Sequence, residues 1–136
     1  MNKNGPIIII EDDEDDQEIF EAIFKKLDIK NELLFFSDGF KALEVIGNSD
    51  IDPFLILSDT NLPALSGYEL REKVRNNQQL SERCTPYLLF TTAASHKAIV
   101  EAYCHSVQGF FVKPLRYDEF EKLMGLIVSY WKECTA

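Results

Sequence analysis

The sequence predicts an α/β fold in which a parallel five-stranded sheet is covered by five helices. Short apolar runs alternate five times with segments whose apolar residues recur every three or four positions. Strands that alternate with helices form strand–helix–strand units, and right-handed crossovers place the helices on both faces of the sheet. The length of 136 residues suits one ordinary domain, so we expect a single domain over 1–136 with its core at about 6–132.

Each predicted strand is a short run of apolar residues. Runs of this kind are typical of strands that are buried on both faces of a parallel sheet. The first run contains only isoleucine, whose branched Cβ favours an extended backbone. The five runs are Ile7–Ile10, Leu33–Phe36, Phe54–Leu57, Tyr87–Phe90 and Phe110–Val112.

Each predicted helix has an apolar face, and two have clear N-cap candidates, Ser37 or Asp38 for the second and Ser95 for the fourth. The third is expected at about Tyr68–Asn76, and the polar stretch Asn77–Thr85 after it is expected to be a surface loop. The apolar positions of the other helices are Ile19, Phe20, Ile23, Phe24 and Leu27; Ala42, Leu43 and Ile46; Ile99, Val100, Ala102 and Tyr103; and Phe120, Leu123, Met124, Ile127, Val128 and Trp131.

The composition narrows the functional classes. A formal net charge of -9 without a basic patch disfavours nucleic acid and anionic membrane surfaces as partners. The longest apolar run is too short to cross a bilayer, and no leader with a basic and then an apolar segment is found. Cys84, Cys104 and Cys134 lie far apart without a CxxC spacing, which favours reduced thiols over disulfides or a zinc site. We therefore expect a cytoplasmic protein.

Polar residues follow four of the five predicted strands. They are Glu11 to Asp16 after the first, Ser58 to Asn61 after the third, Thr91 and Thr92 after the fourth, and Lys113 and Pro114 after the fifth. Because ligands of open parallel sheets bind beyond the carboxyl ends of the strands, these residues are the candidates for a functional site.

The acidic run after the first strand predicts a metal site. Acids near a helix N-terminus interact favourably with the helix dipole, which accounts for Glu14, Asp15 and Asp16. Glu11 and Asp12 instead directly follow a buried strand, where two carboxylates repel each other unless a cation lies between them. Mg²⁺ prefers such oxygen ligands, and Asp59 would supply a third carboxylate.

Asp59 is a candidate nucleophile, because a carboxylate can attack a phosphoryl group and form an aspartyl phosphate. The charge that develops on the phosphoryl oxygens needs a cation, and Lys113 is placed to supply it. Pro114 restricts Lys113 to an extended backbone, and the bond between them is either trans or cis. A hydroxyl at Thr91 can bond a phosphoryl oxygen, whereas Thr92 points to the opposite face of the strand.

These residues resemble those of the receiver domain of bacterial two-component response regulators, the CheY-like family. The resemblance extends from Ile7 to about Trp131 and rests on four segments in the family's order, each at a predicted strand. The segments are IIIIED, LILSDTNLPALSG, LLFTT and GFFVKP. The resemblance implies a flavodoxin-like, doubly wound sheet with strand order 2-1-3-4-5.

The resemblance also implies roles for single residues. Asp59 is the expected phosphoacceptor, and Lys113 the lysine that contacts the phosphoryl group. Asp12 is expected to bind Mg²⁺ (or Mn²⁺) directly, Glu11 largely through water, and Asn61 through its backbone carbonyl. For Asp13, an additional acid beside the pair, the sequence leaves open whether it faces the metal.

The expected signal begins at Thr91, which corresponds to the switch hydroxyl, and at Phe110, which corresponds to a switch aromatic that is often tyrosine. Phosphorylation by a histidine kinase or a histidine phosphotransfer protein is expected to draw Thr91 inward and to let Phe110 follow. The face formed by the fourth predicted helix, the fifth strand and the last helix would then change. The domain is expected to signal rather than to act as an enzyme, although it would carry out its own phosphotransfer and autodephosphorylation.

Only residues 132–136 follow the apolar positions of the last helix, so a stand-alone receiver with a separate downstream effector protein is expected. Leu126, Tyr130 and Trp131 are compatible with a homodimer and equally with core packing, and the sequence leaves both open.

Three other classes compete with this interpretation. A non-phosphorylated pseudo-receiver that acts as a protein-interaction module would not need the full set of Asp12, Asp59, Thr91 and Lys113. A haloacid-dehalogenase-type phosphatase also uses an aspartate nucleophile, but it needs a second aspartate where this chain has Asn61. A flavodoxin would place a flavin phosphate after the first strand, where six acids would repel it.

Overall fold

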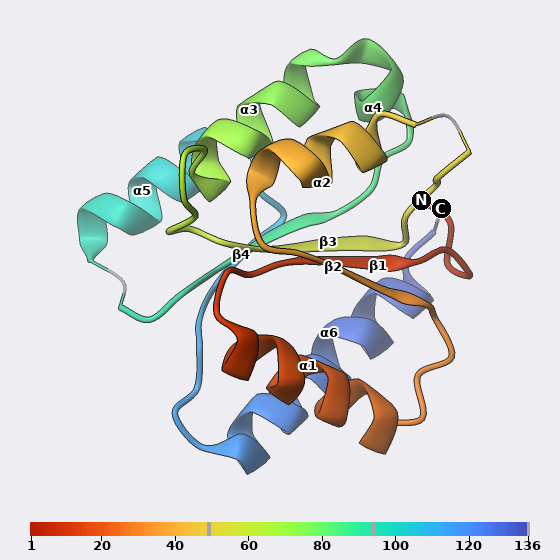
Figure 1. Ribbon diagram of the computed structural model, residues 1–136, viewed down its shortest axis with the longest axis vertical. Helices are drawn as coiled ribbons and strands as arrows, with labels where there is room; N and C mark the ends of the chain where they lie inside the picture. Colours follow the sequence, from red (N-terminus) through yellow and green to blue (C-terminus); the bar gives the residue numbers. More distant parts are fainter. Residues whose placement is uncertain (49, 94, 136) are drawn as a thin grey trace.

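The computed structural model of the protein describes residues 1–48, 50–93 and 95–135. Within them, five parallel strands form one sheet in the order β2-β1-β3-β4-β5, which confirms the predicted fold class and strand order (Figure 1). The strands are β1 (Ile7–Ile10), β2 (Leu33–Phe36), β3 (Leu55–Asp59), β4 (Tyr87–Thr91) and β5 (Gly109–Val112). β3 and β4 reach farther than the apolar runs, so Asp59 and Thr91 are the last residues of their strands.

Six helices lie in the described part of the chain: α1 (Glu14–Lys26), α2 (Gly39–Ile46), α3 (Gly67–Asn76), α4 (Gln78–Glu82), α5 (His96–Cys104) and α6 (Tyr117–Glu133). α1 and α6 cover one face of the sheet, and α2, α3 and α5 cover the other (Figure 1). This arrangement follows from right-handed crossovers between parallel strands. Among the described residues, no helix combines the length and apolar character needed to span a membrane.

The period of two along each strand divides the apolar core between the two faces. Ile7 and Ile9 pack with α1 and α6, whereas Ile8 and Ile10 pack with the helices of the other face. All four isoleucines are buried, as expected for a strand with neighbours on both sides. β2 is an edge strand, and its four residues are only half-buried.

The expectation of a loop over Asn77–Thr85 was wrong for five of these residues, because Gln78–Glu82 form α4. The side chain of Asn77 caps this short helix by accepting a hydrogen bond from the backbone N–H of Leu80. Leu80 is buried against the core, which a turn of helix permits even in a polar segment. The described residues therefore form one helix more than the five predicted.

The last helix divides its candidate interface residues between core and surface. Trp131 is half-buried and packs against the core on the α1 side. Leu126 and Tyr130 are 60% and 63% exposed. Core packing therefore accounts for Trp131, and a homodimer through the other two residues stays a prediction.

Candidate functional site

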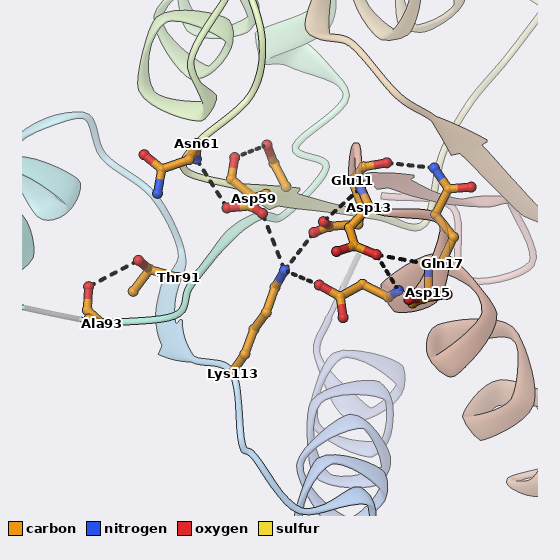
Figure 2. Close-up of polar contacts among 11 residues, drawn as sticks. Glu11, Asp13, Asp15, Gln17, Asp59, Asn61, Thr91, Ala93 and Lys113 are labelled. Atoms are coloured by element: carbon orange, nitrogen blue, oxygen red, sulfur yellow. Dashed lines mark hydrogen bonds and ion pairs between the residues drawn. The ribbon is translucent and has the colours of Figure 1, made fainter.

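The carboxyl ends of β1, β3, β4 and β5 lie side by side at one edge of the sheet. The strand register places Ile10 beside Ser58, Asp59 beside Phe90, and Thr91 beside Val112. The polar residues at these strand ends therefore meet at one site. Glu11, Asp59 and Lys113 are joined there by ion pairs, and Asn61 is joined to Asp59 by a hydrogen bond, whereas the hydroxyl of Thr91 bonds to Ala93 (Figure 2).

Lys113 is at the centre of this site, and its ammonium group points between three carboxylates. Its Nζ lies 2.6 Å from Glu11 Oε2 and 3.2 Å from Asp59 Oδ2 (Figure 2). A third carboxylate oxygen, Asp16 Oδ2, lies 3.1 Å away. The side chain of Lys113 is only 8% exposed, so these charges interact with little screening by water. No cis peptide bond occurs in the described part of the chain, so the bond to Pro114 is trans.

Glu11 and Lys113 perturb each other's ionisation. Burial raises the pKa of Glu11 to about 7, and the charge of Asp59 adds to this rise, although Lys113 acts in the opposite direction. Burial alone would lower the pKa of Lys113, but the hydrogen bond and charge of Glu11, with Asp59 and Asp16, outweigh it and raise that pKa. Lys113 therefore remains a cation, and the site carries an excess of negative charge that a metal ion would reduce.

Glu11, Asp12 and Asp59 form a group that fits a divalent metal. Each offers one carboxylate oxygen, and these oxygens lie within 4.8 Å of one another. Opposite ligands of an octahedral Mg²⁺ lie about 4 Å apart, so small side-chain rotations would bring these oxygens to an ion. Asp12 is exposed, whereas Glu11 is 2% exposed. Asp12 therefore lies at the solvent side of the group and Glu11 at its buried side.

Asp13 does not belong to this group. Its carboxylate accepts hydrogen bonds from the backbone N–H groups of Asp15 and Asp16 and caps α1 (Figure 2). The cap sets the direction in which α1 leaves the site. The Oδ1 atom of Asp13 is therefore engaged at the start of α1.

The loop after Asp59 stays close to the acceptor. The backbone N–H of Asn61 donates to Asp59 Oδ1 at 3.0 Å. A Cβ on Gly67 would lie 2.3 Å from the carbonyl oxygen of Asp59, so only glycine allows α3 to begin at this point. Ser66 and Glu69 form a capping box that fixes the start of the same helix.

Thr91 and Phe110, the two residues of the expected switch, lie in the neighbouring strands β4 and β5. Thr91 is buried, and its hydroxyl donates to the carbonyl of Ala93 at 3.0 Å (Figure 2). Thr92 follows the last residue of β4 and is exposed. Phe110 is half-buried and packs against the core on the α3 side.

Asp16 is the residue of this site that the sequence analysis missed. It was interpreted as an acid near a helix N-terminus, which is correct for its position in α1 but omits its contact with Lys113. The sequence does hold a signal for this contact. Asp16 follows Asp12 by four positions, which is about one helical turn, and residues so spaced lie on the same side of a helix.

Comparisons with known proteins show which family the sequence resembles. A family model described as the response regulator receiver domain matches residues 7–124. The chemotaxis protein CheY-3 of Vibrio cholerae is 30% identical over 114 residues, which cover 84% of this chain and 84% of that protein. The response regulator Rcp1 of Synechocystis sp. is 26% identical over 132 residues, which cover 93% of this chain and 88% of Rcp1.

Solved structures show the same fold. The phosphorylated cyanobacterial phytochrome response regulator RcpA superposes with a TM-score of 0.85 at 20% identity, covering 98% of this chain and 97% of RcpA. The Mn²⁺-bound form of Rcp1 superposes with a TM-score of 0.81 at 25% identity, covering 97% of each chain.

Proposed function

The chain belongs to the response regulator receiver domain family of two-component signalling, and on this premise we propose that Asp59 accepts a phosphoryl group. The single observation that carries the proposal is the position of the Asp59 carboxylate, which ends β3 in contact with Lys113 and within reach of Glu11 and Asp12. The proposed donor is a phosphohistidine of a histidine kinase or of a histidine phosphotransfer protein.

In the proposed reaction, an oxygen of the Asp59 carboxylate attacks phosphorus. An oxygen–phosphorus bond forms while the phosphorus–nitrogen bond of the donor breaks, and its electron pair stays on the histidine ring. Lys113 would hold the transferring group by its ammonium charge. The N–H of Asn61, which donates to Asp59 Oδ1, would orient the carboxylate so that Oδ2 faces the donor.

A divalent metal fits the same site. Glu11, Asp12 and Asp59 would hold Mg²⁺ or Mn²⁺, with the backbone carbonyl of Asn61 as a further ligand. When bound, the ion would neutralise negative charge on the phosphoryl oxygens. The burial of Glu11 favours an indirect contact through water, since its Oε2 already accepts a hydrogen bond from Lys113.

The proposed output is a change of the face formed by α5, β5 and α6. A phosphoryl oxygen on Asp59 would compete with the carbonyl of Ala93 for the hydroxyl of Thr91, and Phe110 would follow the movement of β4. Because Phe110 lacks a hydroxyl, packing alone would transmit this step. We propose one domain, in the cytoplasm, that acts on a separate effector protein.

The test is the intact mass of the protein after incubation with acetyl phosphate or phosphoramidate and Mg²⁺. Wild type should gain one phosphoryl group that hydroxylamine removes, and Asp59→Asn should gain none. Asp28→Asn is a matched control, because Asp28 follows the far end of α1 and asparagine tolerates its positive φ of 55°. An unmodified wild type with every donor would contradict the proposal and leave the pseudo-receiver as the better interpretation.

A further inference from the structure

The ammonium group of Lys113 has no hydrogen to spare. A lysine ammonium has three N–H donors, and three carboxylates lie within hydrogen-bonding distance of this one. Glu11 and Asp59 belong to the ends of β1 and β3, but Asp16 comes from the first turn of α1. A phosphoryl oxygen that approaches Lys113 must therefore displace a carboxylate.

Asp16 is the carboxylate that gives way at the lowest cost. Its side chain is 33% exposed, so water can replace the ammonium group as its partner. Glu11 is 2% exposed and lies closer to Nζ, at 2.6 Å, and it would be left as a buried charge without a partner. The contact with Asp59 changes in any case when that residue carries the phosphoryl group.

We propose that Asp16 competes with the phosphoryl group on Asp59 for Lys113 and thereby slows phosphoryl acceptance. This inference rests on the proposed function of Asp59. Asp16 would act through the lysine, with which its carboxylate forms an ion pair at 3.1 Å. The position of an acid at this point of α1 thus sets how readily the site takes up phosphate.

Asp16 could instead speed phosphoryl acceptance by holding Lys113 in position, but the contacts of Lys113 favour this role less. A partly exposed ion pair contributes little to holding a flexible lysine. Glu11 already provides a closer and more buried contact with the same atom. Repulsion between Asp16 and an incoming phosphoryl group, in contrast, acts across a site that holds four carboxylates and one ammonium group.

The helix dipole alone does not distinguish Asp16 from its neighbour. Asp15 is also in the first turn of α1, is exposed, and its carboxylate is in no hydrogen bond or ion pair with the described residues. Asp15→Asn therefore removes the same charge from the same turn without touching Lys113. It is the matched control for Asp16→Asn.

The experiment measures the rate of phosphorylation of the full chain by acetyl phosphate at saturating Mg²⁺. Asp16→Asn should react about three to ten times faster than wild type. We expect no more than a factor of about ten, because the variant removes a single, partly exposed charge. Asp15→Asn should stay within about twofold of wild type, because its charge is screened by water. Asp16→Glu restores the charge and should return the rate toward that of wild type.

A second measurement follows the lysine itself. Exchange of the Lys113 ammonium hydrogens with water, measured by ¹⁵N NMR in the unphosphorylated protein, should be faster in Asp16→Asn and unchanged in Asp15→Asn. A wild-type or slower phosphorylation rate in Asp16→Asn would overturn the competition while leaving the role of Asp59 intact. No phosphoryl adduct on any form of the protein would overturn the proposed function, and this inference with it.

Discussion

The two helical layers of the protein both pack apolar side chains against the same sheet, but they differ in their buried polar contacts. On the α1 and α6 side, the buried contacts are mainly between apolar side chains, and the ion pair between Lys26 of α1 and Glu121 of α6 lies toward the surface. Phe20 packs edge-on against Phe90 and Phe120, with ring centroids 6.2 and 5.1 Å apart, and it stacks with Phe24. Edge-to-face aromatic pairs add to the free energy of burial and fix the orientation of the rings.

On the other side, the apolar core is supplemented by buried polar groups. The guanidinium of Arg71 donates to the backbone carbonyls of His105 and Ser106 at 3.2 and 2.9 Å, which ties α3 to the end of α5. It also lies over the ring of Tyr87, whose hydroxyl donates to the carbonyl of Gly67. Ala102 is the residue of α5 that is buried.

The difference between the layers indicates which helix can move at a low cost in free energy. Local opening is rare where a helix has many buried apolar contacts, because separating it exposes all of them to water. A helix held by a few directed hydrogen bonds can be released locally. Since α5 follows Thr91 along the chain, the loosely packed helix is next to the proposed switch.

The largest expected effect is at the centre of the apolar layer. Phe20→Ala should lower the free energy of unfolding by about 3–5 kcal/mol, because it removes a buried ring and leaves a cavity. Urea denaturation followed by circular dichroism measures this loss. Ile99→Ala on α5 should cost less than about 1 kcal/mol, because Ile99 is 39% exposed. Similar losses in the two variants would contradict the proposed difference between the layers.

The next effect tests the polar attachment of α5. Arg71→Met keeps much of the side chain's apolar length but removes both hydrogen bonds to the end of the helix. It should lower the free energy of unfolding by about 2 kcal/mol, since hydrogen bonds from charged groups contribute more than neutral ones. Hydrogen exchange should accelerate at the amides of α5 and remain slow in α6.

Arg75→Met is the matched control for this variant, because Arg75 lies one turn farther along α3 and is largely exposed. Its contact is an ion pair with Glu72 at 3.5 Å, which contributes little at the surface. If Arg75→Met accelerated hydrogen exchange in α5 as strongly as Arg71→Met, the loss of any positive charge on α3 would be enough to loosen α5. The hydrogen bonds of Arg71 to the carbonyls at the end of α5 would then not explain how α5 is attached.

The same contrast explains how far the sequence predicted the fold. The strands and the apolar faces of the helices were predictable, because burial on both faces gives the unbroken apolar run Ile7–Ile10 and burial on one face gives the helical period of α6. The hydrogen bonds of Arg71 were not predictable, because they join α3 to backbone atoms 34 and 35 positions away. α4 was missed because its five residues include a single apolar side chain, Leu80, which is too few to show a helical period.

The candidate site divides in the same way. Glu11, Asp59 and Lys113 were predictable, because the ends of parallel strands meet at one edge whatever the details of packing. The contact of Asp16 with Lys113 was not, because it depends on the angle at which α1 lies over the sheet. That angle is set by the Asp13 cap and by the apolar packing of α1 against α6.

The smallest expected effect comes from the buried hydroxyl of Tyr87, and its dependence on pH makes it specific. Tyr87→Phe should lower the free energy of unfolding by about 1 kcal/mol at pH 8, because the carbonyl of Gly67 loses its donor. Burial raises the pKa of Tyr87 well above that of a free phenol, although Ser58 and Arg71 act in the opposite direction.

This raised pKa gives the sign of the pH effect. Above about pH 10, the phenol ionises in the unfolded chain but keeps its proton in the folded protein, so the folded state binds more protons. Wild type should then lose stability with rising pH by up to about 1.4 kcal/mol per unit, and Tyr87→Phe should lack this part of the loss. Urea denaturation of both proteins at pH 8, 10 and 11 should show the difference between them shrinking toward zero. Other groups such as Lys113 titrate in both proteins and cancel in the comparison. If the difference in the free energy of unfolding between the two proteins stayed constant across this range, the hydroxyl of Tyr87 would be hydrated in the folded state. The buried polar contacts of this layer would then be those of Arg71 alone.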